Sequence, residues 1–267
     1  MTTADWVSAA AALALDGVEL YWPAIRDADD DTLGQLRRTA TDLGVALPMM
    51  CASPDFTQRD REAFESEIAD EARAIRATAT LGGGYTRILS GQRRPNVARS
   101  TGIDLVVEAI NRLLPIAAEC RVTLVMENHI RDYFWDYPEF AQDSGTFLEI
   151  IRAIPEDAPF GVQFDPSNAL VSGENPVWFL EQVAHRVVTA AASDRYVATG
   201  AGGQTHVVHA IVGQGQLDHD LLCSILADAG FQGWISIEDG DDPLMGLADI
   251  AASAEYMRDV MGRHGLP

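Results

Sequence analysis

Short apolar runs alternate with segments of helical periodicity along the chain, and this alternation restricts the possible folds more than any other sequence feature. The strand-like runs cover residues 17–22, 46–53, 85–91, 122–129, 160–168, 187–195 and 234–240. The helix-like segments cover residues 31–43, 61–81, 103–120, 146–154, 176–184, 218–229 and 245–261. Strands that alternate with helices of this length indicate βαβ units and therefore a parallel sheet.

A chain of 267 residues has the usual size of one eight-fold α/β barrel, and no linker interrupts the series. We therefore expect a single domain over residues 1–267. Only seven runs qualify as barrel strands, because residues 3–16 have a helical pattern where a barrel needs its first strand. Three explanations stay open: the barrel is open at this point, another segment fills the gap, or the gene starts further upstream. After a Gly-rich stretch (200–203), residues 206–213 form a further extended segment, which we expect to pass over the rim.

The composition excludes several classes of protein. A formal net charge of −21 argues against a nucleic-acid partner, because binding to phosphates needs clustered Lys and Arg. The three cysteines are widely spaced and predict reduced thiols. No signal peptide is visible, and the apolar stretch 7–15 is too short to span a bilayer. We expect a cytoplasmic protein without a membrane partner.

Three of the strand-like runs deliver a carboxylate where the apolar stretch ends: Glu127, Asp165 and Glu238. The carboxyl ends of barrel strands meet at one rim, so these side chains can surround one ion or substrate. Each of these carboxylates also has a simpler structural explanation when it is considered alone. Glu127 could belong to a salt bridge or a helix cap, and Asp165, in the sequence Asp-Pro-Ser-Asn, could be an N-cap with Asn168 pointing back to it.

Oxygen-rich ligation with one or two imidazoles suits a divalent metal. Mn²⁺ is favoured, and Mg²⁺, Co²⁺, Fe²⁺ and Zn²⁺ are alternatives. Such an ion polarises neighbouring carbonyl and hydroxyl oxygens and stabilises an enediolate. Two glutamates beside it, Glu127 and Glu238, could then move a proton between adjacent carbons, one as base and the other as acid. This is the chemistry of sugar isomerases and epimerases.

Several motifs, spread over nearly the whole chain, are similar to those of a known family. They are CASPDFT (51–57), RILSGQRRP (87–95), ENH (127–129), DYPEFA (136–141), FDPSNAL (164–170), ASDRY (192–196), HAIVGQGQLD (209–218) and GWISIEDG (233–240). With them the sequence resembles the xylose isomerase-like TIM barrel superfamily, which includes sugar phosphate isomerase/epimerase proteins, ketose 3-epimerases and endonuclease IV (AP endonuclease family 2 type). The resemblance implies a (β/α)8 TIM barrel, and the incomplete or missing first strand counted above is a departure from that pattern.

The resemblance also implies roles for single residues. Glu127, Asp165 and Glu238 fall on metal-ligand positions, and Glu127 and Glu238 on the acid/base pair. The family has a histidine as the fourth ligand where this chain has Ala191. His209, after the Gly-rich stretch, is our candidate to replace that ligand, although it could equally contact substrate or pack in a loop.

Further residues near the expected rim are candidates for substrate binding: His129, Asn168, Arg195, Arg87 and Trp135. Arg195 falls where the family places a cation against substrate oxygens, and guanidinium groups such as that of Arg87 suit hydroxyls or phosphate. Trp135 belongs to an aromatic loop (133–137) that could form a wall or lid over the substrate, or a protein interface. The remaining histidines at 185, 219 and 264 are expected to face solvent.

The sequence therefore predicts a metal-dependent isomerase or epimerase that acts on a sugar, cyclitol or related polyol. One alternative is a lyase on the same fold, acting on an oxidised sugar or glycoside. A second alternative is a metal-depleted, non-catalytic binding or partner subunit, because Ala191 removes a ligand. Assembly into a homo-oligomer is left open.

Overall fold

The computed structural model describes residues 2–199, 205–238 and 246–267. Contacts between residues divide it into two compact units, Met1–Gly161 and Val162–Pro267, which we call the N-terminal unit and the C-terminal unit. The single domain expected over residues 1–267 stays a prediction. The Gly-rich stretch 200–203 and residue 245, the first of the last predicted helix, lie outside the described residues.

In the N-terminal unit, parallel strands are separated by helices. Its elements are α1 (Thr3–Ala12), β1 (Leu20–Tyr21), α2 (Trp22–Ile25), α3 (Asp30–Leu43), β2 (Met49–Cys51), α4 (Arg61–Leu81), β3 (Tyr85–Ile88), α5 (Arg99–Cys120), β4 (Thr123–Glu127), α6 (Ser144–Ala153) and the start of β5 (Phe160–Phe164). One register row crosses four strands through Leu20, Met50, Thr86 and Leu124. The amide of Leu124 donates to the carbonyl oxygen of Pro159, just before β5, at 3.0 Å.

Helix α4 shows how local sequence sets these boundaries. Its N-cap Asp60 accepts a hydrogen bond from the amide of Ala63 at 2.9 Å, which satisfies an N–H group that has no partner within the helix. The helix ends before Gly82, which has the left-handed conformation (φ 86°) favoured by glycine. A Cβ on Gly83 would lie 2.7 Å from the carbonyl oxygen of Leu47, so only glycine allows this close approach to the chain before β2. The helix predicted over residues 61–81 is therefore confirmed.

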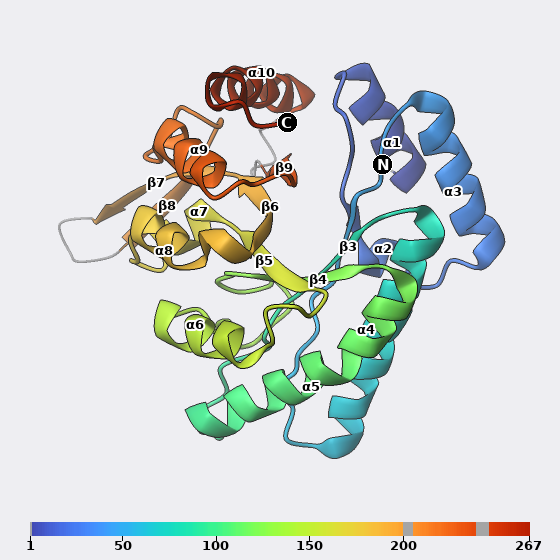
Figure 1. Ribbon diagram of the computed structural model, residues 1–267, viewed down its shortest axis with the longest axis vertical. Coiled ribbons are helices and arrows are strands. Elements are labelled where there is room, and N and C mark those ends of the chain that lie inside the picture. The colour runs from blue at the N-terminus through green and yellow to red at the C-terminus, as the bar shows by residue number, and fades with distance from the viewer. Residues whose placement is uncertain (1, 200–204, 239–245) are drawn as a thin grey trace. The chain divides into compact units, whose positions relative to one another are not determined.

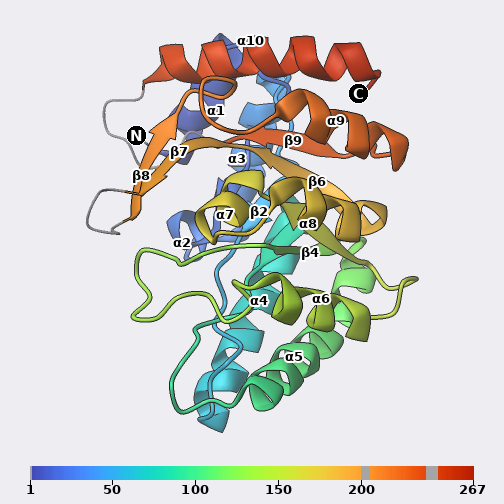
Figure 2. The same cartoon turned by 90° about the vertical axis from the view of Figure 1, so that its left-hand side faces the viewer.

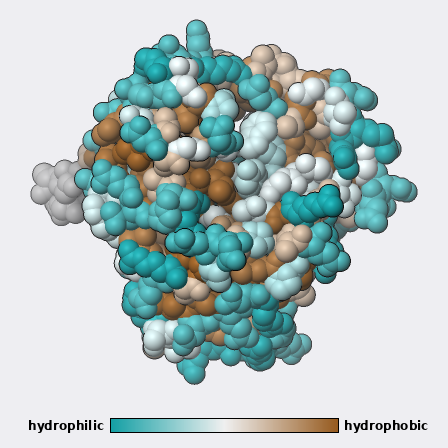
Figure 3. All heavy atoms as spheres, viewed as in Figure 1, coloured by the Kyte–Doolittle hydropathy of each residue, from teal (hydrophilic) through white to brown (hydrophobic). Residues whose placement is uncertain are grey.

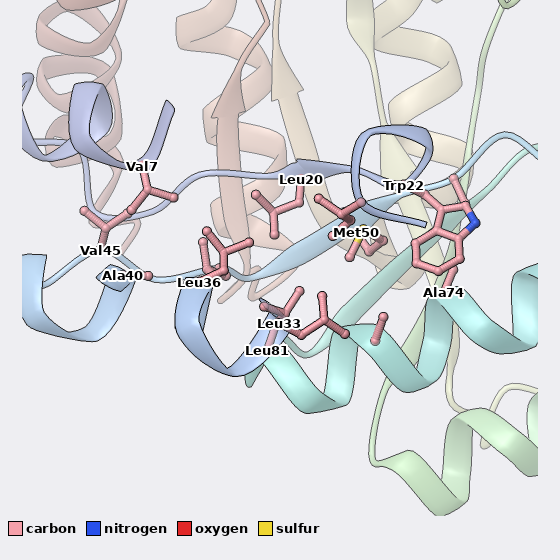
Figure 4. Close-up of a cluster of buried hydrophobic side chains, with 14 of the residues drawn as sticks. Val7, Leu20, Trp22, Leu33, Leu36, Ala40, Val45, Met50, Ala74 and Leu81 are labelled. Atoms are coloured by element: carbon pink, nitrogen blue, oxygen red, sulfur yellow. The ribbon is translucent and has the colours of Figure 1, made fainter. Parts of the chain in front are cut away.

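Apolar side chains from α1, α3, α4, β1 and β2 form a core of the N-terminal unit (Figure 4). Val7 of α1, Leu36 of α3, Met50 of β2 and Leu81 of α4 are each at most 9% exposed. Burial of a side chain of this size stabilises the fold by about 1.5 to 3 kcal/mol. The helix expected within residues 3–16 is thus present as α1 and contributes to the core.

The C-terminal unit continues the alternation. Its elements after β5 are α7 (Pro166–Val171), α8 (Pro176–Val183), the 3₁₀ turn η1 (Ala184–Arg186), β6 (Val187–Ala192), β7 (Asp194–Thr199), β8 (Thr205–Ala210), α9 (His219–Asp228), β9 (Trp234–Ile237) and α10 (Leu247–His264). β6 pairs in parallel with β5 and with β9. Ala192 of β6 packs with Val212, Cys223, Met257 and Val260, so α9 and α10 both contribute to this core.

A separate two-stranded ribbon, β7 and β8, follows β6 (Figure 2). Its strands are antiparallel, with Arg195 opposite His209 and Val197 opposite Val207. The segment 206–213 was expected to be extended and outside the series of barrel strands. Its residues 206–210 belong to strand β8, which confirms the expectation for them, whereas residues 212–213 form a turn.

The parallel strands follow one another in the order β1-β2-β3-β4-β5-β6-β9, and β5 belongs partly to each unit (Figure 1). Seven parallel strands in the described part of the chain equal the number counted from the sequence, and the α/β class is confirmed. Hydrophilic side chains cover much of the face in Figure 3, with smaller apolar patches between them. None of the helices in the described ranges combines the length and apolar character needed to cross a membrane.

Candidate functional site

In the N-terminal unit, the candidate site centres on Glu127, the last residue of β4, which is 1% exposed. Its Oε2 accepts a hydrogen bond from Nη1 of Arg87 at 2.7 Å. Arg87 also donates from Nε to the carbonyl oxygen of Ala52 at 3.2 Å and from Nη2 to Oγ of Ser53 at 3.1 Å. The salt-bridge reading of Glu127 is therefore confirmed. A buried carboxylate needs such a partner to stay ionised.

Two residues past Glu127, His129 lies beside a second buried acid that the sequence reading missed. Its Nδ1 is 3.6 Å from Oε2 of Glu139, which is 0% exposed and accepts from the amide of Ser90 at 2.6 Å. Burial opposes the charged imidazole, but the negative charges of Glu127 and Glu139 outweigh it and raise the pKa of His129. Glu139 lies inside the DYPEFA motif, which was noted for its resemblance but not read for chemistry.

The aromatic loop after Glu127 divides into a buried and an exposed part. Trp135 is only 3% exposed, and Arg131 donates to its carbonyl oxygen from Nε at 3.0 Å and from Nη2 at 2.7 Å. Tyr133 and Phe134 are exposed, and their rings meet edge to face with centroids 5.3 Å apart. The loop thus has an anchored base and exposed rings, and substrate contact by Trp135 stays a prediction.

In the C-terminal unit, Asp165 follows β5 and is fully buried as the N-cap of α7. Its Oδ1 accepts from the amides of Ser167 at 2.7 Å and Asn168 at 3.1 Å, and from Oγ of Ser193 at 2.7 Å. Its Oδ2 accepts from Nδ2 of Asn168 at 2.8 Å. Both the capping role of Asp165 and the orientation expected for Asn168 are confirmed. These donors fix the carboxylate without cancelling its charge.

Glu238 follows β9 directly and is exposed. Its amide donates to the carbonyl oxygen of Ala192 at 3.0 Å, which ties it to the end of β6. Asp165 and Glu238 present carboxylate oxygens within 4.8 Å of each other, as two ligands of one ion can. Two of the three predicted acidic ligands are thus brought together inside one unit, while Glu127 ends β4 in the other.

Arg195 and His209 face each other across the ribbon of β7 and β8. Nη1 of Arg195 contacts Nδ1 of His209 and lies 2.9 Å from its Nε2, and Nε donates to Oγ of Ser167 at 3.0 Å. Arg195 is thereby linked through Ser167 to Asp165, which agrees with a place near the expected substrate site. Metal ligation by His209 stays a prediction, and a guanidinium beside its ring disfavours a second cation there.

Ala191, the position of the missing histidine, is a buried residue of β6 opposite Ser236 of β9. Thr189, two residues earlier and so on the same face of the strand, pairs in register with Gln163 of β5. Oγ1 of Thr189 and Oε1 of Gln163 are buried and make no hydrogen bond within the described residues. The side of β6 that carries Ala191 therefore offers oxygen atoms but no imidazole.

A buried aspartate, Asp194, lies against Gly213 and Gly215, and its contacts explain why glycines occupy these two positions. Asp194 accepts from the amides of Gly213 at 3.1 Å and Gly215 at 2.8 Å, and a Cβ on Gly215 would lie 2.1 Å from its Oδ1. His219, expected to face solvent, is only 3% exposed and its Nε2 is 3.6 Å from Asp194. That expectation was wrong, because this first residue of α9 turns inward to the carboxylate. Burial raises the pKa of Asp194, but the nearby imidazole of His219 and the hydrogen bonds from the backbone outweigh it, and the pKa is lowered.

The chain was compared with known families and proteins. A family model described as a xylose isomerase-like TIM barrel matches residues 7–260. The inosose dehydratase of Clostridium botulinum (strain Alaska E43 / Type E3) is 23% identical over 163 residues, which are 57% of this chain and 50% of that protein. The chain therefore spans about half the length of this curated relative.

Solved structures share the fold at low identity. A D-psicose 3-epimerase, in the presence of D-fructose, has a TM-score of 0.80 and 14% identity, covering 98% of this chain and 94% of that one. A xylose isomerase-like TIM barrel protein from Mycobacterium smegmatis, in complex with magnesium, has a TM-score of 0.79 and 16% identity, covering 98% and 88%. These similarities confirm the predicted TIM-barrel class of fold.

Proposed function

The chain belongs to the xylose isomerase-like TIM barrel family, and from this premise we propose that it is a metal-dependent isomerase or epimerase of a sugar, cyclitol or related polyol. The observation that carries the proposal is the pair of carboxylates at the ends of β5 and β9, whose oxygens lie within 4.8 Å of each other. Glu127 ends β4, the neighbour of β5 in the strand order, and we take it as the third acid of the site.

The donor set fits a hard divalent cation. Carboxylate oxygens suit Mn²⁺ and Mg²⁺ better than a thiophilic metal. Glu127, Asp165 and Glu238 would hold the ion, with His209 as the candidate fourth ligand and water or substrate as the alternative. When bound, the ion polarises carbonyl and hydroxyl oxygens of the substrate. The neutral hydrogen bonds to Asp165 support this role, because they orient the carboxylate and leave its charge available.

The protein's own residues supply the proton transfer. Glu127 and Glu238 would act on opposite sides of a substrate C–H group: one removes the proton and the other returns a proton to the same or the adjacent carbon. Arg87 holds Glu127 in place through the 2.7 Å hydrogen bond. Arg195, His129, Asn168 and Trp135 are the proposed substrate contacts, with Arg195 suited to hydroxyl oxygens.

A lyase is the second candidate, and the similarity to an inosose dehydratase favours it. Removal of a proton next to a carbonyl begins both reactions, and loss of a β-hydroxyl as water would then replace return of the proton. Product analysis separates the two reactions. Incubation with a keto-sugar or a keto-cyclitol gives an isomer of unchanged mass for the isomerase, and a product lighter by one water for the lyase.

The test of the proposed chemistry is solvent deuterium exchange at a substrate carbon, measured with added Mn²⁺. Glu127→Gln and Glu238→Gln should each lower the exchange rate by about 10² to 10⁴-fold, because each removes a proton-transfer group. Glu119→Gln and Glu255→Gln, exposed on α5 and α10, are the matched controls and should exchange like the wild type. Absence of exchange in the wild type over a panel of ketoses and keto-cyclitols would sink the proposal.

Metal content of the purified protein tests the non-catalytic alternative, in which Ala191 has cost the chain its ion. Stoichiometric metal in the wild type contradicts that alternative. If the wild type binds none, Ala191→His should restore binding, because it returns an imidazole to the position beside the acids. Failure of both the wild type and Ala191→His to hold metal would contradict the proposed metal site itself.

A further inference from the structure

A cavity of about 320 Å³ lies wholly within the N-terminal unit, between the loop after β2, helix α2 and helix α4. Its size is that of a site for a small molecule. Three acids of α4, Glu67, Asp70 and Glu71, line it together because their i, i+3, i+4 spacing places them on one face of the helix. Asp55 from the β2 loop adds a fourth acid.

The four acids divide into two with arginine partners and two without. Arg94 binds both carboxylate oxygens of Asp55, and the pKa of Asp55 is lowered although burial opposes this. Asp70 is 3.1 Å from Nη2 of Arg26, and it accepts from Nε1 of Trp22 at 3.0 Å. Glu67 and Glu71 form no salt bridge within the described residues.

Glu71 is the most unusual group of the cavity. It is 2% exposed, and its Oε1 has no hydrogen-bond partner among the described residues. Burial, with the charge of Asp70 beside it, raises the pKa of Glu71 well above the ordinary value. Burial likewise raises the pKa of Glu67 to about 7, although its Oε2 accepts from the amide of Asp55 at 3.1 Å. An acceptor left unsatisfied in a cavity costs free energy that a donor from a ligand can recover.

The residues that line the cavity favour an organic ligand rather than a bare metal ion. Trp22, Phe134 and Trp135 line it, and aromatic rings bind sugar faces and organic cations but not hard metals. Among the described residues, no three acids of this cavity have oxygens close enough to one another to share an ion. Ser53, Gln58 and Gln92 add polar groups that can meet hydroxyls.

We propose that this cavity binds the protonated primary amine of a small polyol, such as an amino sugar. An ammonium group brings three N–H donors and one positive charge, which match the two glutamates that lack an arginine partner. The aromatic rings take the apolar face of the sugar ring. The inference concerns binding alone and holds whether or not the proposed reaction takes place.

Calorimetric titration of the full chain with D-glucosamine, D-glucose and N-acetyl-D-glucosamine at neutral pH tests the proposal. Glucosamine should bind at least about tenfold more tightly than the two neutral sugars, the usual effect of charge-assisted hydrogen bonds. Glu67→Gln and Glu71→Gln should each remove that preference. Both replace a poorly solvated carboxyl group by an isosteric amide, so their thermal midpoints should not fall. Glu62→Gln, exposed on the same helix, is the matched control and should bind like the wild type.

Two further measurements distinguish binding of the amine in this cavity from binding at the proposed active site and from metal binding. Glucosamine binding should persist in Glu127→Gln with excess chelator, which separates this test from the proposed metal site and acid/base pair. Equal affinity for glucosamine and glucose, or an unchanged preference in both glutamate variants, would overturn the proposal. Displacement of glucosamine by Mg²⁺ that disappears in Glu71→Gln would overturn it as well, and would make the cavity a metal site.

Discussion

The two units keep a buried carboxylate in place by different means. In the N-terminal unit, Glu127 is paired with the full positive charge of Arg87 at 2.7 Å. In the C-terminal unit, Asp165 takes hydrogen bonds from neutral amide and hydroxyl groups, including Asn168 and Ser193. Pairing cancels charge, whereas neutral donors only orient it. The difference teaches that the charge of Glu127 is already balanced by an arginine inside its own unit, whereas the carboxylate of Asp165 is oriented by neutral groups that add no positive charge.

The largest expected effect comes from breaking the pair in the N-terminal unit. Arg87→Met leaves Glu127 buried without its cation and should lower the free energy of unfolding by about 3 to 5 kcal/mol. Urea denaturation measures this. Adding Glu127→Gln to Arg87→Met should recover much of the loss, because the uncompensated charge is gone.

The exposed pair of Arg112 and Glu65 is the matched control, with oxygen–nitrogen distances of 2.6 and 2.8 Å. Arg112→Met should leave the urea midpoint nearly unchanged, since solvent screens exposed pairs. Equal losses for Arg87→Met and Arg112→Met would contradict the view that burial makes the first pair essential.

A smaller effect is expected from the neutral donors of the C-terminal unit. Ser193→Ala removes the 2.7 Å hydrogen bond to Oδ1 of Asp165 and should cost about 1 kcal/mol of stability. It should also weaken Mn²⁺ binding by about tenfold, because the carboxylate is less well oriented. Titration calorimetry with Mn²⁺ measures the second effect. Loss of stability with unchanged metal affinity would show that Ser193 supports the cap of α7 and not an ion.

A further effect concerns the acids of the α4 cavity and depends on pH. The carboxyl of Glu67 ionises near 4.5 when unfolded but at about 7 in the folded chain, because burial raises its pKa. The folded state is therefore penalised progressively as pH rises from 4.5 to about 7. Glu67→Gln lacks this penalty, so its stability relative to the wild type should rise over that window by on the order of 2 kcal/mol, allowing for partial solvation.

Denaturation at a series of pH values, with Glu62→Gln alongside, measures the difference. The control should follow the wild type at every pH. A constant offset between Glu67→Gln and the wild type would mean that Glu67 is solvated as an ordinary surface acid.

Local signals in the sequence predicted much of the fold. The cap Asp60 and the break at Gly82 bound α4. Glu127, Asp165 and Glu238 were found because an acid recurs at the same place, the end of an apolar run, in three separate strands. The pairing of Glu127 with Arg87 could not be predicted. These residues are 40 positions apart and meet only through the register of β3 on β4.

The orientation of the helices was the second feature that could not be predicted from the sequence. Periodicity identified the polar face of α4, but a polar face is ordinarily solvated, and nothing local shows that Glu71 lines a cavity together with Trp22 and Trp135. The same limit explains why the burial of His219 was not predicted. Its place at the start of α9 was clear from the sequence, whereas its contact with Asp194 depends on how that helix packs.

The burial of Glu71 has a consequence for the energetics of the cavity. Burial raises the pKa of Glu71, and a bound ammonium ion beside it favours the ionised form, so binding of the amine and release of a proton are coupled. The heat of glucosamine binding should then vary with the ionisation enthalpy of the buffer. Affinity should also strengthen with rising pH as Glu67 loses its proton near 7, up to the pH where the amine itself becomes neutral.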